Sequence, residues 1–292
     1  RRQRQLCIRD RYRLALSATL ERHGDEEGTQ ALYDYFGEKC IEYDLQRAIK
    51  EDKLTPYYYY PCVVHLTEEE LKRYRELSAK LKKQCHVDSS GKVTMSEQGK
   101  KIAIERARLI AGAENKVYLL KKIISEKYLK DTHMLIYCGA ARNYNPSLDS
   151  SETDEEGERQ IVSVSKMLGN ELGMKVTHFT SAESAQERSR IKTQFANADP
   201  YQAIVAIKCL DEGVNIPSIK TAFILASSTN PKEYIQRRGR VLRKYKGKKF
   251  AVIYDFVTLP TAIDDVQYGS DGSNFDLSLV KREICLLYTS PS

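Results

Sequence analysis

The chain has 292 residues, enough for one or two domains with apolar cores, and a formal net charge of +7 at pH 7. Its seven cysteines are scattered, without a C-x-x-C pair or a histidine at ligand spacing, which argues against a zinc site or a disulfide framework. No apolar run reaches the ~18 residues of a membrane helix and the start does not read as a signal peptide, so we expect a soluble, cytoplasmic protein without a membrane partner. The moderate basic excess fits a polyanionic partner.

The first predicted element is a buried strand at Leu14–Leu16, which ends in the small polar turn Ser17-Ala18-Thr19. Three short elements follow: a helix at 31–36, a strand at 40–43 and a helical turn at 45–49. Tyr57–Tyr60, which lie between Pro56 and Pro61, should alternate between two faces, as side chains of a strand do. We interpret these tyrosines first as a half-buried strand, and second as a platform on which bases stack.

A helical region comes next. Thr67 followed by Glu70 predicts a capping box at a helix start. Apolar residues then recur at three- and four-residue steps, which predicts an amphipathic helix: Leu71, Tyr74, Leu77 and Leu81. Two further helices are predicted at 102–111 and 116–129. We expect this region to connect two lobes.

From Met134 onward, short apolar strands alternate with helices. The strands are predicted at 134–138, 175–179, 203–207, 222–226 and 250–256, with helices at 161–172 and 184–195. This order predicts an α/β fold with a parallel sheet that is covered by helices on both faces. Ligands of such sheets collect at the carboxyl ends of the strands.

Small and polar residues follow the first two of these strands. Gly139 ends the first strand, and Thr180 and Ser181 lie between the second strand and a helix. A helix N-terminus and nearby hydroxyl groups favour phosphate, although ordinary capping explains Thr180 and Ser181 equally well.

The third strand leads into the loop 208–217, in which Gly213 allows another backbone to come close. The pattern around Asp211 and its neighbour Glu212 indicates a functional acidic residue and an ordinary solvated turn equally well. Thr229 follows the fourth strand, next to Asn230, whose place is explained by capping of the helix that comes after it.

That helix is opened by Asn230, Pro231 and Glu233 and leads into the octet QRRGRVLR at 236–243. The steps of four and three residues predict that Gln236, Arg240 and Arg243 share one helix face. Two guanidinium groups and an amide on one face suit a triphosphate. A solvated basic helix is the alternative.

The pattern Gln236-x-x-Gly239-Arg240-x-x-Arg243 resembles motif VI of superfamily 2 helicases and translocases (DEAD/DEAH-like), in a style closest to excision-repair and type I restriction motors. Other segments resemble the late motifs of the family in order: 17–19 resembles motif III, 137–139 motif IV by position, and 208–217 motif V. Asn215 stands where relatives usually carry Asp, so the site lacks that charge.

The resemblance implies ATP and Mg²⁺ as cofactors, with no metal held by this chain. The implied catalytic residues are Gln236, Arg240 and Arg243, the arginines acting as fingers on ATP. The implied cofactor-binding residues are Ser17, Thr19, Asp211, Gly213 and Asn215. The implied nucleic-acid-binding residues are Gly139, Thr180, Ser181 and Thr229.

In this family a separate lobe binds the phosphates of ATP, and we expect that lobe to lie outside this sequence. The chain has no G-x-x-x-x-G-K-[ST] loop, and no Asp-Glu pair upstream of Ser17 to hold magnesium. Since ATP hydrolysis needs a phosphate cradle, a metal and an activated water, we expect the isolated chain to be inactive. Its expected partner is the N-terminal helicase lobe of the same polypeptide.

The expected organisation is therefore a RecA-like parallel sheet, preceded by a remnant of a first RecA-like lobe and a helical connector. We place the remnant at 1–66, the connector at 67–112, the second RecA-like domain at 113–262 and a tail at 263–292. The end of the tail continues no earlier pattern and reads as non-native sequence.

The leading hypothesis is the C-terminal motor lobe of an ATP-dependent helicase or translocase that acts on DNA. Two alternatives stay open. One is a non-catalytic nucleic-acid-binding module of the same fold, which Asn215 and the missing phosphate loop favour. The other is the lobe of an RNA helicase.

Overall fold

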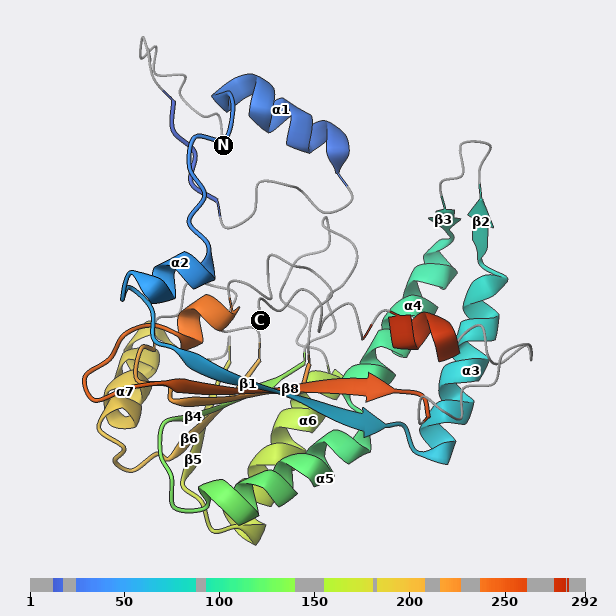
Figure 1. Cartoon of the computed structure of the whole chain (residues 1–292). Helices are drawn as coiled ribbons and strands as arrows, with labels where there is room; N and C mark the ends of the chain where they lie inside the picture. Colours follow the sequence, from blue (N-terminus) through green and yellow to red (C-terminus); the bar gives the residue numbers. More distant parts are fainter. Residues whose placement is uncertain are drawn as a thin grey trace.

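The computed structural model describes residues 13–17, 25–87, 93–139, 155–180, 183–207, 216–226, 237–261, 276–281 and 283. A six-stranded sheet lies at its centre, with every neighbouring pair parallel, in the order β1-β8-β7-β4-β6-β5 (Figure 1). The strands are β1 (Tyr57–His65), β4 (Met134–Cys138), β5 (Val176–Phe179), β6 (Ala203–Ile207), β7 (Thr221–Ile224) and β8 (Ala251–Leu259). The predicted α/β class with a parallel sheet is confirmed.

Helices cover both faces of this sheet, as predicted. One face packs against α5 (Glu114–Ile123) and α6 (Glu155–Lys166), each continued by a π-helical turn, η1 (Ile124–Tyr128) and η2 (Met167–Glu171). The opposite face packs against α7 (Ala185–Ala196), α2 (Leu45–Lys50) and a short helix at 237–241. Because both faces are buried, β4 and β6 are apolar along their whole length, which is the pattern that identified them in the sequence.

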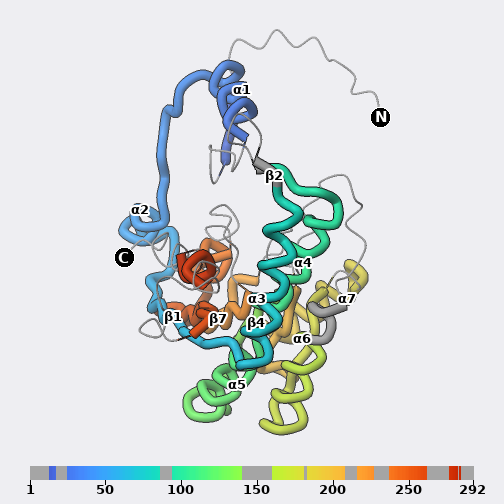
Figure 2. Tube along the Cα trace, turned by 90° about the vertical axis from the view of Figure 1, so that its right-hand side faces the viewer, coloured from blue at the N-terminus to red at the C-terminus, as the bar shows by residue number. Residues whose placement is uncertain are grey.

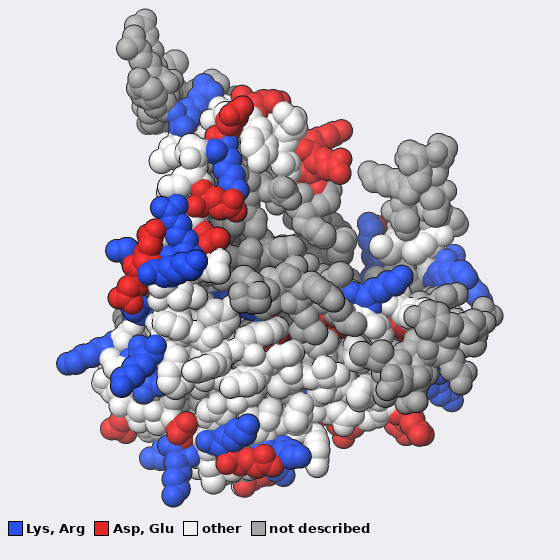
Figure 3. All heavy atoms as spheres, viewed as in Figure 1, with Lys and Arg blue, Asp and Glu red and all other residues white. Residues whose placement is uncertain are grey.

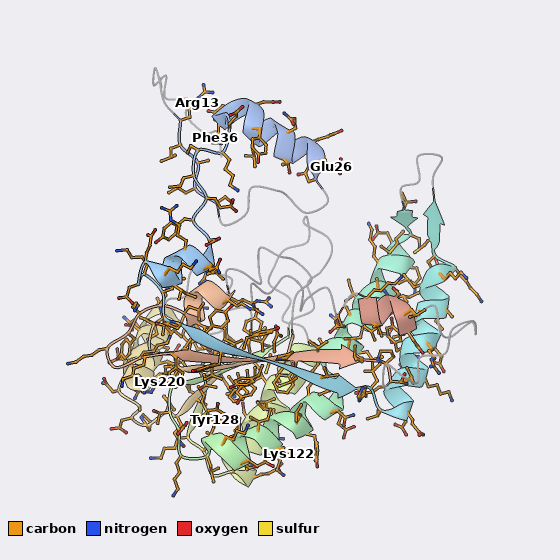
Figure 4. The ribbon with its side chains drawn as sticks, in the orientation of Figure 1. Arg13, Glu26, Phe36, Lys122, Tyr128 and Lys220 are labelled. Atoms are coloured by element: carbon orange, nitrogen blue, oxygen red, sulfur yellow. The ribbon has the colours of Figure 1, made fainter. Side chains whose placement is uncertain are left out.

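An aromatic cluster ties the covering helix to the sheet. Tyr128 of η1, labelled in Figure 4, meets the rings of Phe223 and Tyr254 edge-on, and its hydroxyl lies 3.0 Å from that of Tyr254. On β1, Tyr60 stacks on Tyr254 at 5.1 Å between ring centroids. Exposed and less exposed side chains alternate from Tyr57 to Tyr60, so the first interpretation of these tyrosines, a half-buried strand, is confirmed.

The place of β1 corrects the expected boundary at residue 66. All nine residues of β1 pair in parallel with β8, from Tyr57 with Ala251 to His65 with Leu259. A strand buries its backbone polar groups by pairing, and β8 offers that pairing within this chain. The segment 57–65 therefore belongs to the same sheet as β4 to β8, and not to a separate unit before residue 66.

The helical connector has the predicted helices and one hairpin that the sequence did not reveal. Thr67 and Glu70 form the predicted capping box at the start of α3 (Glu68–Lys82), which packs against α4 (Glu97–Ala111). Between the two helices lies an antiparallel pair, β2 (Cys85–Val87) and β3 (Val93–Met95). In both orientations this unit projects from the sheet (Figures 1 and 2).

Part of the predicted tail, residues 276–281 and 283, packs on the rest of the molecule. The carboxylate of Asp276, which is 3% exposed, pairs with Arg75 of α3 at 2.5 Å. Glu283 accepts a hydrogen bond from the main-chain N–H of Thr258 in β8 at 3.2 Å. These two contacts join the helical connector to the end of the sheet.

The N-terminal region departs from the predictions. The predicted strand at Leu14–Leu16 is wrong: this segment is irregular, and Leu14 and Leu16 are 73% and 87% exposed. The predicted strand at 40–43 is also irregular, with Ile41 62% exposed. A strand needs a neighbour to satisfy its backbone, and the part of the chain described here gives these two segments none.

The predicted helix at 31–36 is confirmed within α1 (Glu26–Phe36), which has no buried residue. Figure 4 places Arg13 beside the end of α1 that carries Phe36, and its guanidinium lies 4.2 Å from the ring centroid of Tyr35. None of the helices in the described ranges has both the length and the apolarity needed to cross a bilayer.

Candidate functional site

The carboxyl ends of the central strands meet at one edge of the sheet, because all the strands are parallel. Gly139 follows β4 at this edge and donates its main-chain N–H to the side-chain oxygen of Gln160 at 3.1 Å. A Cβ added to Gly139 would lie 2.6 Å from the Cβ of Ala226, just beyond β7. Close packing between two strand ends thus accounts for the glycine.

Thr180 follows β5 and forms a closed turn. Its main-chain N–H and its hydroxyl both donate to the carboxylate of Glu183, at 2.6 and 3.0 Å. Its carbonyl accepts a hydrogen bond from Arg188 at 2.9 Å. In this structure a carboxylate therefore occupies the donors that we expected to meet phosphate, and Thr180 serves the start of α7.

Two buried cations hold the main chain beyond β7. The ammonium of Lys116, 2% exposed, donates to the carbonyl of Leu225 at 2.7 Å. Arg237, 7% exposed, donates to the carbonyl of Ala226 at 3.2 Å, and its guanidinium lies 4.3 Å from the ring centroid of Tyr137. The sequence analysis missed both residues, although Arg237 stands within the motif itself.

A second buried arginine anchors the same helix to β1 and β8. Arg238 is fully buried, with its guanidinium 4.1 Å from the ring centroid of Tyr59 and 3.8 Å from the carboxylate of Asp255. Tyr59 donates its hydroxyl to Asp255 at 2.9 Å. Burial, and then the charge of Asp255, raise the pKa of Tyr59, so its hydroxyl keeps its proton at neutral pH. Neither contact could be read from local spacing, because Tyr59 and Arg238 are far apart in the sequence.

The predicted common helix face of Gln236, Arg240 and Arg243 is wrong for Arg243. The described helix ends at Val241, and Arg243 forms an antiparallel bridge with Leu54. The main-chain N–H of Thr55 donates to the carbonyl of Leu242 at 2.7 Å. This hydrogen bond from another segment takes the place of a bond within the helix. The helix therefore ends two residues before Arg243.

Arg240 and Arg243 are each partly exposed, so the octet combines two buried arginines with two at the surface. The position of a Cβ on Gly239 has no described neighbour within 4 Å, as expected for a glycine that leaves room. On the face shown in Figure 3, basic and acidic side chains mix over α1 and α2, and the surface along β1 is mostly uncharged. Among the described residues, Lys and Arg therefore do not form a single patch on this face.

Of the remaining predicted site residues, Ser17 alone lies within the described ranges. Ser17 is exposed in the irregular N-terminal segment. Seven predicted residues lie outside the residues that the structure describes: Thr19, Ser181, Asp211, Gly213, Asn215, Thr229 and Gln236. Within the described ranges, no group of three or more His, Cys, Asp or Glu residues could hold a metal ion.

Comparison with known proteins gives one family and several relatives. Residues 115–245 match the family described as helicase conserved C-terminal domain. Over 266 residues, the chain is 26% identical to the DNA 3'-5' translocase XPB2 of Sulfurisphaera tokodaii, an alignment that covers 86% of this chain and 54% of that protein. The chain thus spans about half the length of this relative.

Two solved structures are similar. One is the fragment structure of a candidate HsdR subunit of a type I restriction enzyme from Vibrio vulnificus YJ016, with 17% identity, a TM-score of 0.49 and coverage of 85% of this chain and 40% of that one. The other is the Sulfolobus solfataricus SWI2/SNF2 ATPase C-terminal domain, with 13% identity, a TM-score of 0.46 and coverage of 77% and 96%.

Proposed function

We propose that this chain provides a helicase lobe of the superfamily 2 type, which the motif at Gln236–Arg243 resembles. The proposal starts from the match of residues 115–245 to the helicase conserved C-terminal domain. The chain acts as the C-terminal lobe of an ATP-driven DNA translocase. DNA is favoured over RNA because the relative that the chain matches over most of its length is a DNA translocase. ATP is bound between this lobe and an ATP-binding lobe that carries the phosphate loop.

The observation that carries this proposal is that two of the four arginines of the octet are buried and two are partly exposed. Arg237 is buried against Tyr137, near the carboxyl end of β4, and Arg238 is buried against Tyr59 of β1, so both fix the helix to the sheet. Arg240 and Arg243 are partly exposed. A solvated basic helix would bury none of its arginines, whereas a helix that presents charge to a ligand needs such anchoring.

ATP and magnesium fit this chain in part. Arg240 and Arg243 offer the positive charge that the phosphates of ATP require, whereas the described residues provide no set of metal ligands. Bound ATP would supply the free energy of phosphoryl transfer to water. In that reaction Arg240 and Arg243 would neutralise charge on the phosphate oxygens as it develops, and the buried arginines would keep both in place.

The test is ATP hydrolysis, with and without duplex DNA, by a protein in which this chain is joined to its ATP-binding lobe. We expect DNA-stimulated hydrolysis from the joined protein and none from the isolated chain. Arg243→Ala should lower kcat by about 10³-fold or more, as the loss of an arginine finger does. The matched control is Arg190→Ala, since Arg190 is an exposed arginine of α7.

An unchanged kcat in Arg243→Ala would refute the proposal. Robust hydrolysis by the isolated chain would do the same. If the joined protein binds DNA but does not hydrolyse ATP, the chain is a binding module of the same fold. Matched DNA and RNA oligonucleotides compared across a salt series identify the track, because phosphate contacts set the salt dependence but not the choice.

A further inference from the structure

The carbonyl groups at the end of the arginine helix (237–241) and in the two residues after it are held by two residues from outside the helix. An α-helix leaves its final four carbonyls without partners of its own. Here the last helical bond runs from the N–H of Leu242 to the carbonyl of Arg238, at 3.0 Å. The carbonyls of Val241, Leu242 and Arg243 accept hydrogen bonds from Thr55 and Lys248 instead.

Lys248 holds two of these carbonyls with its ammonium group. It donates to the carbonyl of Val241 and, at 3.1 Å, to that of Arg243. A third contact, at 3.5 Å, reaches the carbonyl of Pro217, which ends the segment that resembles motif V. The side chain is 7% exposed, so its ammonium group donates to these carbonyl oxygens and not to water. A cation at a helix C-terminus also interacts favourably with the helix dipole.

Thr55 holds the same turn from the other side. Its main-chain N–H donates to the carbonyl of Leu242 at 2.7 Å, and its hydroxyl donates to that of Arg243 at 3.4 Å. Thr55 is fully buried. An ion pair between Lys244 and Asp52 continues this contact between the two segments. The carbonyl of Arg243 thus accepts hydrogen bonds from two residues, Thr55 far before it and Lys248 shortly after it in the sequence.

The two donor residues, Thr55 and Lys248, are held in place by the pairing of β1 with β8. Thr55 lies just before β1 and Lys248 lies just before β8, and these strands pair along their whole length. The main-chain N–H of Ala251 also donates to the carbonyl of Pro56 at 2.9 Å, which fixes the starts of the two strands to each other. The position of the Arg243 main chain is therefore set by the sheet, although Arg243 lies beyond the helix.

We infer that Thr55 and Lys248 are positioning residues for Arg243: they fix its main chain so that its guanidinium reaches one point in space. This inference rests on the proposed function, in which Arg243 meets the phosphates of ATP. A catalytic group must be held closely, because a displacement of about 1 Å can cost about a hundredfold in rate. Without the two donors, a residue beyond the helix end would fray with the terminus.

The test uses the protein in which this chain is joined to its ATP-binding lobe, and measures kcat, KM for ATP and Tm. Lys248→Met should lower kcat about tenfold or more, and Thr55→Val about threefold, with KM for ATP nearly unchanged. Thr55→Ser keeps the hydroxyl and should restore kcat. The matched controls are Thr258→Val, which removes a buried hydroxyl of β8 that donates to the carbonyl of Ile110 in α4, and Lys249→Met, which alters an exposed neighbour.

A second measurement does not depend on hydrolysis. In the isolated chain, the side-chain NMR signal of the Nε–H of Arg243 should broaden or shift in Thr55→Val and Lys248→Met, and return in Thr55→Ser. It should stay unchanged in Thr258→Val. The inference is overturned if both measurements respond to Thr55→Val no more than to Thr258→Val. If Arg243→Ala keeps full kcat, the proposed function fails, and the NMR comparison still decides whether Thr55 and Lys248 position Arg243.

Discussion

The guanidinium of Arg238 lies 4.1 Å from the ring centroid of Tyr59, although 178 positions separate the two residues in the sequence (238 minus 59, less one). The contact fastens the arginine helix to β1, which lies at one edge of the sheet. Both side chains also meet the buried carboxylate of Asp255. The stability of the domain and the placement of its arginine segment therefore depend on the same three residues.

The first prediction concerns this buried group. Arg238→Met should lower the free energy of unfolding by about 3–5 kcal/mol, because it leaves the carboxylate of Asp255 buried without its cation. The double variant Arg238→Met/Asp255→Leu should recover much of that loss, since it removes both charges. Urea unfolding of the isolated chain measures both values. Equal losses in the single and the double variant would show that the ion pair does not matter.

The second prediction concerns Gly139. Gly139→Ala places a methyl group 2.6 Å from the Cβ of Ala226, so the two strand ends must move apart. The expected cost is about 1–3 kcal/mol of unfolding free energy, as for other overpacked sites. Ala226→Gly in the same chain should restore most of it. A stable Gly139→Ala variant would contradict the close packing of β4 and β7 at this edge.

The third prediction concerns the pH dependence of stability. Burial lowers the pKa of Lys248 to about 8, below its ordinary value of 10.5. Between these values the unfolded chain binds a proton that the folded chain has released, so the contribution of Lys248 to stability rises with pH. From pH 8 to 9 the free energy of unfolding should therefore rise by up to about 1 kcal/mol, relative to Lys248→Met.

The pH window ends at 9 because a cysteine then acts in the opposite direction. Burial raises the pKa of the Cys62 thiol to about 11, from an ordinary 9.0, so above pH 9 the folded chain binds the extra proton and loses stability. Parallel pH curves for the wild type and Lys248→Met would show that the ammonium of Lys248 titrates as it does in the unfolded chain.

The fourth prediction concerns α1. Since α1 has no buried residue, a chain that begins at Asp44 should unfold within about 0.5 kcal/mol of the full chain. A chain that ends at Thr261 is the control, and it should lose several kcal/mol, because Leu279 is buried and Asp276 and Glu283 anchor the final helix. A large loss from the first truncation would mean that residues before Asp44 pack against the domain.

Local patterns were sufficient for most of the second domain. The strands predicted at 134–138 and 203–207 match β4 and β6 residue for residue, and the capping boxes at Thr67 and Ser184 are present. The resemblance to superfamily 2 helicases is confirmed by the family match at 115–245. These features depend on residues a few positions apart, so spacing reveals them.

The failures share a non-local cause. Apolar triplets such as Leu14–Leu16 read as strands, but a strand needs a partner, and the partner of any segment is decided by the fold. The boundary at residue 66 was misplaced for the same reason, because β1 pairs with a strand about 190 positions later. The spacing of Gln236, Arg240 and Arg243, at steps of four and three residues, could not show that Thr55 ends the helix first.

The sequence by itself determined most of the strands and helices from Met134 onward, their α/β order and the family resemblance, because periodicity and short motifs are local properties of a chain. The tertiary structure alone decided which arginines are buried, where the arginine helix ends and which residues hold Arg243. Burial and carbonyl capping depend on the sheet that brings Thr55, Tyr59, Lys248 and Asp255 together. Contacts of this kind arise only when β1 and β8 pair.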